Sequence, residues 1–341
     1  MIGSRFQEIV SKYSSLSVAV LGDFCLDRYL DIDSDRNEIS IETGLPVYNV
    51  SHVRSLPGGA GTIVNNLSAL GVSRILPIGL VGEDGEGYEL CRALEQLPGV
   101  KTGSIVRTPK RRTFTYCKPM VCSPGGKQRE LNRFDFKNWT PTSAMLQGSI
   151  IGELEEIAGQ VDAIVILDQV DIPETGVVTR MVLDRIKRLA NEDSDLVIIA
   201  DSRRSLRDFP AVIFKMNAAE LKELIKADTD LSFDEVGKVA AELALKNRRS
   251  VFVTLAEKGI VGTTADGQYG HVAALPLRGE IDIVGAGDAV SANLAAAIAA
   301  GASLEETLEL GNAAASVVIH KLGTTGTANV GEIEKLLVLE P

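Results

Sequence analysis

Short apolar runs alternate with amphipathic runs along most of the chain, and this alternation constrains the fold more than any other feature. The strand-like runs are apolar at nearly every position, which is typical of strands buried on both faces of a parallel sheet. The pattern predicts an α/β fold with a doubly wound, mainly parallel sheet and helices on both faces. The predicted strands are residues 17–22, 74–82, 163–168, 196–201 and 250–256, and the predicted helices are 60–70, 87–97, 173–190, 287–300 and 303–320, with one more after Asn217.

Two segments break this rhythm, because polar and apolar residues alternate along them as in half-solvated antiparallel strands. We predict that they form a small β-sheet lid over about 28–53 and 111–136, with Pro124-Gly125-Gly126 as a turn. No long linker or repeat interrupts the chain, so we expect a single domain over 1–341. The lid strands would leave an exposed edge, and we expect a homodimer that pairs through them.

Charge and composition exclude several classes of protein. Acidic residues outnumber basic ones by 46 to 35, for a net charge of -11, so we expect no nucleic-acid partner. No run approaches the roughly 18 apolar residues of a membrane span, and the start of the chain lacks the pattern of a signal peptide. The four cysteines have no metal-ligand spacing, so a reducing cytoplasm is the expected location.

The segment EIDIVGAGDAVSANLAAAIAAG (280–301) carries the strongest chemical signal. Small residues at 285–287 precede a helix, so backbone N–H groups and the positive helix end can surround an anion. A carboxylate such as Asp288 is poorly placed to bind an anion, but it can accept the proton of a hydroxyl that attacks one. Because a helix N-terminus stabilises negative charge, we expect its proton affinity to be low. The motif alone leaves open the alternative that Asp288 only caps the helix.

Two further segments are weaker signals. LPGGAGTIVNNLSALG (56–71) opens a helix with almost no side chains, so a ligand can approach the backbone there. Asp23 and Asp27 follow a buried strand, at the sheet edge where ligands of α/β folds bind, and a carboxylate there can accept sugar hydroxyls. Each also fits an ordinary turn. A dinucleotide-binding motif would need glycine at Val290, and no P-loop is present.

Together, the two glycine-rich segments resemble the signatures of the PfkB, or ribokinase-like, carbohydrate kinase family. PGGAGTIVNNLSALG (57–71) resembles the amino-terminal signature and DIVGAGDAVSANL (282–294) the carboxyl-terminal one. KMNAAELKEL (215–224), VTLAEKGI (253–260) and GNAAASVVIHKLGTTG (311–326) resemble further family segments, in the same order. The resemblance covers nearly the whole chain. It implies a ribokinase-like fold and transfer of the γ-phosphoryl group of ATP, with Mg²⁺, to a hydroxyl of a sugar or sugar phosphate.

The resemblance and the positions of the residues give a predicted role to each candidate. Asp288 is the predicted base, beside a phosphate-stabilising turn of Gly285, Ala286 and Gly287. The predicted acceptor ligands are Asp23, Asp27, Gly58, Gly59, Asn66, Arg133 and Asp168. The predicted Mg²⁺ residues, partly through water, are Asn217 and Glu220, and the predicted nucleotide residues are these two with Thr254, Glu257, Gly259, Asn312 and Arg203. A monovalent cation such as K⁺ near Asp282 and Val284 is implied by the resemblance alone.

Within the family, DRNEISIETGLPVYNV (35–50) and NAAASVVIHKLGTTG (312–326) look most similar to the kinase domain of bacterial D-glycero-β-D-manno-heptose-7-phosphate kinases. Thr62 stands where those kinases have asparagine, Asp171 where they have lysine, and 201–204 read DSRR where they have DPKG. These departures fall in the sugar pocket, so heptose 7-phosphate is one expected acceptor among several. No nucleotidyltransferase motif follows, and we expect one activity rather than two.

Three alternatives stay open at this point. The acceptor could be a nucleoside, because Tyr29, Tyr48, Phe114 and Tyr116 could stack on a base. A sugar-binding sensor without catalysis could use the same fold. A nicotinamide oxidoreductase is the rival from another class of enzyme, and the missing glycine of its motif argues against it. The cluster Arg203, Arg204 and Arg207 is either solvated surface charge or a phosphate contact at a strand end, to ATP or to a sugar phosphate.

Overall fold

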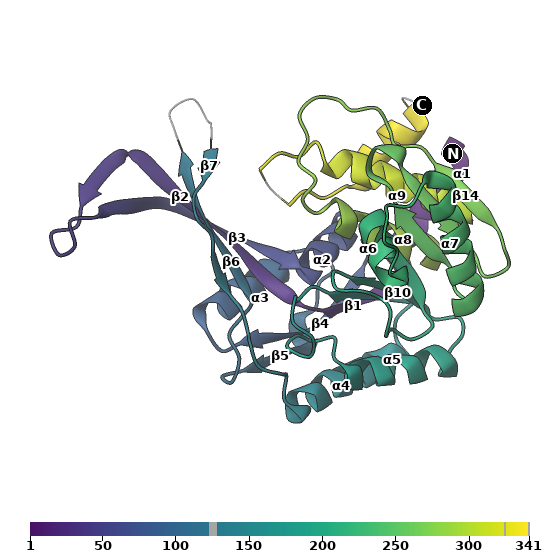
Figure 1. Ribbon diagram of the computed structural model, residues 1–341, viewed down its shortest axis with the longest axis horizontal. Coiled ribbons are helices and arrows are strands. Elements are labelled where there is room, and N and C mark those ends of the chain that lie inside the picture. Colours follow the sequence, from purple (N-terminus) through teal and green to yellow (C-terminus); the bar gives the residue numbers. More distant parts are fainter. Residues whose placement is uncertain (123–127, 324, 340–341) are drawn as a thin grey trace.

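The computed structural model describes residues 1–122, 128–323 and 325–339, which form two β-sheets (Figure 1). The larger sheet is parallel from β12 to β5 and ends in two antiparallel strands. This confirms the predicted mainly parallel α/β sheet. In spatial order its nine strands, as far as the chain is described, are β14 (Tyr269–Val272), β13 (Ile260–Thr263), β12 (Val251–Thr254), β11 (Ile213–Asn217), β10 (Val197–Ser202), β9 (Ala163–Asp168), β1 (Ser17–Gly22), β4 (Arg74–Gly82) and β5 (Ile105–Thr108).

Helices cover both faces of this sheet, because alternate residues of each strand enter different cores. In β1, Val18 and Val20 pack into one core and Ala19 and Leu21 into the other. No helix in the described segments is long and apolar enough to cross a membrane. The first core is covered by α1 (Gly3–Ser11), α2 (Ala60–Ala69), α3 (Gly85–Glu95), α8 (Ala286–Ala299), α9 (Leu304–Val318) and α10 (Val330–Glu334), and the second by α4 (Ala144–Ala158), α5 (Arg180–Glu192), α6 (Ala218–Ile225) and α7 (Phe233–Asn247).

The smaller sheet is the lid, and its long β2–β3 hairpin reaches away from the rest of the molecule (Figure 1). β2 pairs with β3 in antiparallel fashion, as predicted, but it pairs with β6 in parallel. The parallel pair arises because the chain passes through β4, α3 and β5 between these strands. The predicted turn at 124–126 lies outside the described residues. The lid strands are β2 (Phe24–Ile39), β3 (Pro46–Gly59), β6 (Thr115–Cys122), β7 (Gln128–Glu130) and β8 (Phe134–Phe136).

Asp23, directly after β1, holds the loop that follows β9. Its Oδ2 accepts the N–H groups of Gln169 at 2.9 Å and Val170 at 3.2 Å, and its Oδ1 accepts that of Val177 at 2.7 Å. The side chain is buried, and a Cβ at Gly176 would collide with its carboxylate. Asp23 is therefore a structural clamp for this loop, and its predicted role as an acceptor ligand stays a prediction. This loop is also the reason that α5 begins at Arg180, later than its sequence pattern indicates.

Removing this clamp should destabilise the protein. A hydrogen bond to a charged group contributes about 1.5–3 kcal/mol, so Asp23→Ala should lower the free energy of unfolding by about 3 kcal/mol or more. Asp208→Ala, at an exposed aspartate, is the matched control and should change it by less than about 0.5 kcal/mol. Denaturant unfolding measures both, and equal stabilities of the two variants would contradict the clamp.

Candidate active site

The amino-terminal end of α8 lies at the carboxyl edge of the parallel strands and offers open backbone donors. Gly285 precedes the helix in a left-handed conformation (φ 83°), where a Cβ would lie 2.8 Å from the Thr325 side chain. The N–H of Ala286 donates to the backbone carbonyl of Ile283 at 3.2 Å. Contrary to our prediction, this N–H is therefore not free to bind a phosphate. The N–H groups of Gly287 and Asp288 have no acceptor in the described part of the chain. Two free donors and a helix end thus meet at one point.

The carboxylate of Asp288 is partly exposed and makes no hydrogen bond or ion pair with any described residue. Burial and the charge of Asp201 raise the pKa of Asp288 to about 7, against the opposing charges of Lys215 and Arg203. The low proton affinity that we expected from the helix end is therefore wrong, because desolvation and a neighbouring carboxylate outweigh the helix. A pKa near neutrality suits a general base.

Arg203, which follows β10, carries an exposed guanidinium that has no bonded partner among the described residues. Burial raises the pKa values of Asp288 and Glu220, and the charge of Arg203 opposes both rises, so Arg203 lies within electrostatic reach of both groups. The other two arginines of the cluster are occupied: Arg204 pairs with Asp168 at 2.8 Å, and Arg207 donates to the last carbonyls of α6. Arg203 is thus the member of this cluster that is free to bind an anion.

Two predicted acceptor ligands, Asp168 and Asn66, are buried and bonded within the protein, and their roles toward an acceptor stay predictions. Asp168 has no exposed surface, and its Oδ2 accepts bonds from Ser202 at 2.7 Å and Arg204. Burial and the nearby Asp23 raise its pKa to about 6. Asn66 is equally buried inside α2, where its amide joins this helix to the segment at 328. Neither side chain is open to a ligand in this structure.

Asp27 and the glycine pair of β3 do come together on the lid. Asp27 forms a 2.8 Å ion pair with Lys118 of β6, a residue that the sequence analysis missed. A Cβ at Gly58 would collide with the Asp27 carboxylate and lie 2.8 Å from the Cys25 sulfur, so only glycine permits this approach. Gly59 has a positive φ of 56° and ends the strand. The sequence gives one signal for Lys118: it is the single charged residue of its strand.

Cations cover the aromatic rings on the same face of the lid. Arg54 and Lys118 both lie 4.7 Å from the centre of the Tyr29 ring. Arg133 lies 4.4 Å from the centre of the Tyr116 ring, held there by a bidentate ion pair with Asp135. Burial raises the pKa of Tyr116 to about 12, while the charges of Arg203 and Arg133 oppose that rise. Tyr116 therefore lies within electrostatic reach of two cations, Arg133 on the lid and Arg203 on the body.

The predicted Mg²⁺ residues cap α6. Asn217 Oδ1 accepts the N–H of Glu220 at 2.9 Å, and Glu220 Oε2 accepts the N–H of Asn217 at 2.8 Å. Glu220 Oε1 accepts none of the hydrogen bonds that the structure shows, so one carboxylate oxygen stays available. Within the described residues, no three His, Cys, Asp or Glu side chains gather as a metal site. This arrangement fits Mg²⁺, which is commonly held by one or two carboxylates, water and substrate phosphates.

The predicted nucleotide and monovalent-cation residues lie along the strands and helix beside this end of α8. Gly259 turns the chain between β12 and β13 with a positive φ of 88°, and Asn312 donates to the carbonyl of Ala273 at 2.8 Å. Asp282 Oδ1 accepts the N–H of Val284 at 3.0 Å. Thr254 ends β12, and Glu257 is exposed without a partner among the described residues. The roles of all six stay predictions.

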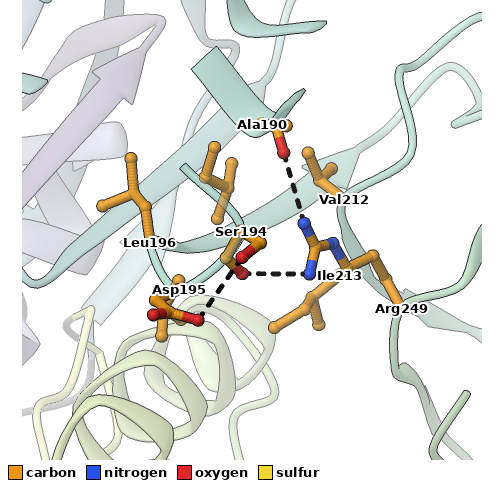
Figure 2. A pocket seen from close by; sticks show the side chains of 9 residues that line it. Ala190, Ser194, Asp195, Leu196, Val212, Ile213 and Arg249 are labelled. Atoms are coloured by element: carbon orange, nitrogen blue, oxygen red, sulfur yellow. Dashed lines mark hydrogen bonds between the residues drawn. The ribbon is translucent and has the colours of Figure 1, made fainter. Parts of the chain in front are cut away.

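Figure 2 shows a small cavity, of about 90 Å³, whose lining includes residues at the starts of β10 and β11. The cavity thus lies at the amino-terminal edge of the sheet, opposite the end of α8. Arg249 borders it and donates to the carbonyls of Ala190 at 3.3 Å and Ser194 at 3.2 Å. These bonds cap the end of α5, and ligands of α/β folds bind at the other edge of the sheet. The cavity is therefore structural.

Comparison with known proteins decides which family has this arrangement. The model of the pfkB family carbohydrate kinases matches residues 15–329. The chain belongs to this family. The predicted resemblance is thereby confirmed, and so is the ribokinase-like fold.

Relatives and solved structures agree with this assignment. The chain is 32% identical to "Bifunctional protein HldE" of Azorhizobium caulinodans over 308 residues, which cover 90% of this chain and 61% of that protein. It is 33% identical to the protein of the same name from Hyphomonas neptunium, covering 98% and 66%. The chain thus spans about two thirds or less of the length of these relatives. Two solved structures share the fold. Arabidopsis thaliana ribokinase complexed with ribose and ATP has a TM-score of 0.67 and 19% identity, covering 94% of this chain and 98% of that one. Escherichia coli phosphofructokinase-2 in complex with fructose-6-phosphate has a TM-score of 0.67 and 20% identity, covering 94% of this chain and 97% of that one.

The raised pKa of Asp288 can be measured without any substrate. Carboxyl ¹³C resonances followed against pH, with Asp288→Asn to assign the signal, should give a midpoint near 7. Asp201→Asn removes the second largest cause of the rise, so the midpoint should move to lower pH. A midpoint at or below the usual value near 3.9 in the unmodified protein would contradict this description of the site.

Proposed function

We propose that this chain is an ATP-dependent sugar kinase that transfers the γ-phosphoryl group of ATP to a hydroxyl of a phosphorylated sugar. One observation carries the proposal: the carboxylate of Asp288 lies beside the N–H donors of α8, and neither has a partner within residues 1–122, 128–323 and 325–339. A base and an anion site at one point are what phosphoryl transfer to an alcohol requires. Membership of the pfkB family supports the same activity.

In this mechanism Asp288 accepts the proton of the acceptor hydroxyl. The acceptor oxygen forms its bond to the γ-phosphorus while the bond from that phosphorus to the bridging oxygen breaks and leaves ADP. The N–H groups of Gly287 and Asp288 and the guanidinium of Arg203 stabilise the negative charge of the transferred group. Asn217 and Glu220 would hold Mg²⁺, partly through water, and the bound ion would neutralise phosphate charge. The ion pair of Asp27 and Lys118 offers an acceptor and donors to sugar hydroxyls.

Several observations favour a phosphorylated sugar over a nucleoside. Arg203 has no partner among the described residues, and its charge reaches Tyr116, which makes this side of the site suitable for an anionic acceptor. The faces of Tyr29 and Tyr116 are in contact with cations, so they are poor platforms for a base. Heptose 7-phosphate is the first acceptor to test, because the sequence resembles kinases of that sugar.

We also propose that a monovalent cation binds near Asp282. We propose further that the protein works in a reducing cytoplasm, which suits its four free cysteines.

An ADP-release screen over sugars, sugar phosphates and nucleosides tests the activity. With the best acceptor, Asp288→Asn should lower kcat by about 10²–10⁴-fold, the usual contribution of a general base. ATP binding should stay equal or tighten, because the change removes a negative charge. Glu280→Gln, at an exposed residue before the turn, is the control and should keep full turnover. Unchanged kcat in Asp288→Asn would contradict the proposal.

The pH profile gives a second check on the base. Below a pH of about 7 Asp288 carries a proton and cannot accept another, so kcat/KM should fall as the pH drops through this value. A plateau that continues down to pH 5 would exclude Asp288 as the base.

We propose further that the lid pairs with the lid of a second copy. Several large apolar side chains at the outer part of the β2–β3 hairpin are exposed, and β3 is an edge strand of its sheet. Exposed apolar edge strands are covered in most stable proteins, and a second copy of the same strand can cover both. The exposed side chains are Ile39, Ile41, Leu45, Tyr48 and Val50.

Replacing two of them should separate the copies. Tyr48→Asp with Val50→Lys should convert a dimer to a monomer in sedimentation at tens of micromolar protein. Tyr88→Asp, at a similarly exposed tyrosine on α3, should leave the dimer intact. A wild-type chain that is monomeric at this concentration would contradict the pairing.

A further inference from the structure

A buried arginine lies at the base of the lid, shortly before β6, and the proposed mechanism gives it no role. Arg111 is 8% exposed and forms no ion pair with a carboxylate in the described part of the chain. Burial lowers the pKa of its guanidinium, and no acidic group opposes that shift. Burying a cation without a carboxylate partner is costly unless other bonds offset the loss of hydration. The hydrogen bonds of Arg111 therefore have to account for its position.

The guanidinium binds carbonyl oxygens of two segments that are distant in the chain. Its Nη1 donates to the carbonyls of Thr140 at 2.7 Å and Pro141 at 3.4 Å, shortly before α4. Its Nη2 donates to the carbonyl of Thr175, in the loop that follows β9. Thr142 joins the two segments, because its Oγ1 lies 3.5 Å from Nη2 and donates to the carbonyl of Gly176 at 2.7 Å. The planar fork of an arginine suits such a set of oxygens, whereas a lysine has one nitrogen.

The loop over 169–177 is thus held by one buried charge of each sign. Asp23 accepts three of its N–H groups, and Arg111 donates to one of its carbonyls. Between these contacts, Glu174 has a left-handed backbone with a φ of 65°, which is uncommon for a residue other than glycine. Such a conformation persists only where the surrounding contacts hold it. We therefore expect this loop to relax when Arg111 is lost.

The loop borders the candidate active site through Val170. This side chain is buried in a small cluster with Cys25 and Phe114, against which Tyr116 of the lid packs. Burial raises the pKa of Cys25, and four charged groups of the site also act on it. These groups are Asp27, Lys118, Arg203 and Asp288. The cluster therefore lies within electrostatic reach of both the lid pair and the proposed base, and its shape depends on the loop that carries Val170.

We propose that Arg111 is a positioning residue for the acceptor, because it holds the loop over 169–177 in the shape that packs Val170 against the lid. This inference rests on the proposed kinase function. Arg111 contacts no reacting atom and acts only through the loop. Its hydrogen bonds reach none of α6, β12 and α8, where the nucleotide and Mg²⁺ residues lie. Loss of Arg111 should therefore weaken acceptor binding and leave nucleotide binding unchanged.

Arg111→Met is the first variant, because methionine fills part of the space but has no donors. The KM for the acceptor should rise by about tenfold or more, while kcat at saturating acceptor stays within about threefold. Calorimetric titration with the non-hydrolysable ATP analogue AMP-PNP and Mg²⁺ should give an affinity within about twofold of the wild type. Arg185→Met is the matched control, at an arginine of α5 whose side chain is 12% exposed, and it should change none of these quantities.

Thr142→Val is a second variant, which keeps the buried charge of Arg111 and the side-chain volume but removes the hydroxyl that joins the two segments. It should raise the acceptor KM by about threefold or more. Amide hydrogen exchange gives a readout that needs no catalysis. In both variants the N–H groups of 169–177 should exchange about tenfold faster or more, while those of α8 should keep their wild-type rates.

The outcomes separate this inference from the proposed function. If both variants keep the wild-type KM and exchange rates, Arg111 does not hold the loop and the inference fails alone. If acceptor and nucleotide affinities fall together, Arg111 supports the whole fold and the inference also fails. If the wild type phosphorylates no acceptor, the proposed transfer fails and the role toward an acceptor fails with it, even where the loop exchanges faster. Should Arg111→Met not fold, Thr142→Val decides between these outcomes.

Discussion

The positive end of α8 is fixed at the carboxyl edge of the parallel sheet, and the charged groups of the site are arranged around it. The helix is apolar along most of its length and packs into the first core, so its position is set by burial. Its first turn leaves two N–H groups without acceptors among the described residues. Leaving such donors unsatisfied costs about 1–3 kcal/mol each, and their partial exposure lets water or a ligand satisfy them. A fold that keeps these donors open is prepared for an anion.

Two layers of charge lie around this helix end, with different roles. Asp201 and Lys215 are buried and bonded to each other, so they form a fixed support. Asp288 and Arg203 are more exposed and have no side-chain partner in the part of the chain that the structure describes, so they can contact a substrate. The buried Asp201 connects the two layers, because its charge contributes to the raised pKa of Asp288. The support thereby sets the protonation of the proposed base.

The sequence predicted the fold well, because burial on both faces leaves a plain pattern in strands such as β1 and β9. Asp288 and its turn were also predicted, since small residues before a helix have few other uses. Hydrogen-bond partners were not predictable in the same way. Asp23, Asn66 and Asp168 lie in the right segments, but their partners, backbone N–H groups for the first two and the Arg204 side chain for Asp168, come from segments distant in the chain. Lys215 and Lys118 were missed because each is a single charged residue in an apolar strand. Such a residue indicates a buried ion pair only when its acidic partner is known, and each partner lies on another strand.

The direct test of the role of α8 is the behaviour of two backbone amides. In ¹⁵N–¹H spectra, we expect the signals of Gly287 and Asp288 to move downfield when AMP-PNP and Mg²⁺ bind, because their free N–H groups gain a charged acceptor. AMP, which lacks the terminal phosphates, should move them much less. If these two signals stay in place while others report that AMP-PNP is bound, the anion site is elsewhere and the end of α8 does not serve phosphoryl transfer.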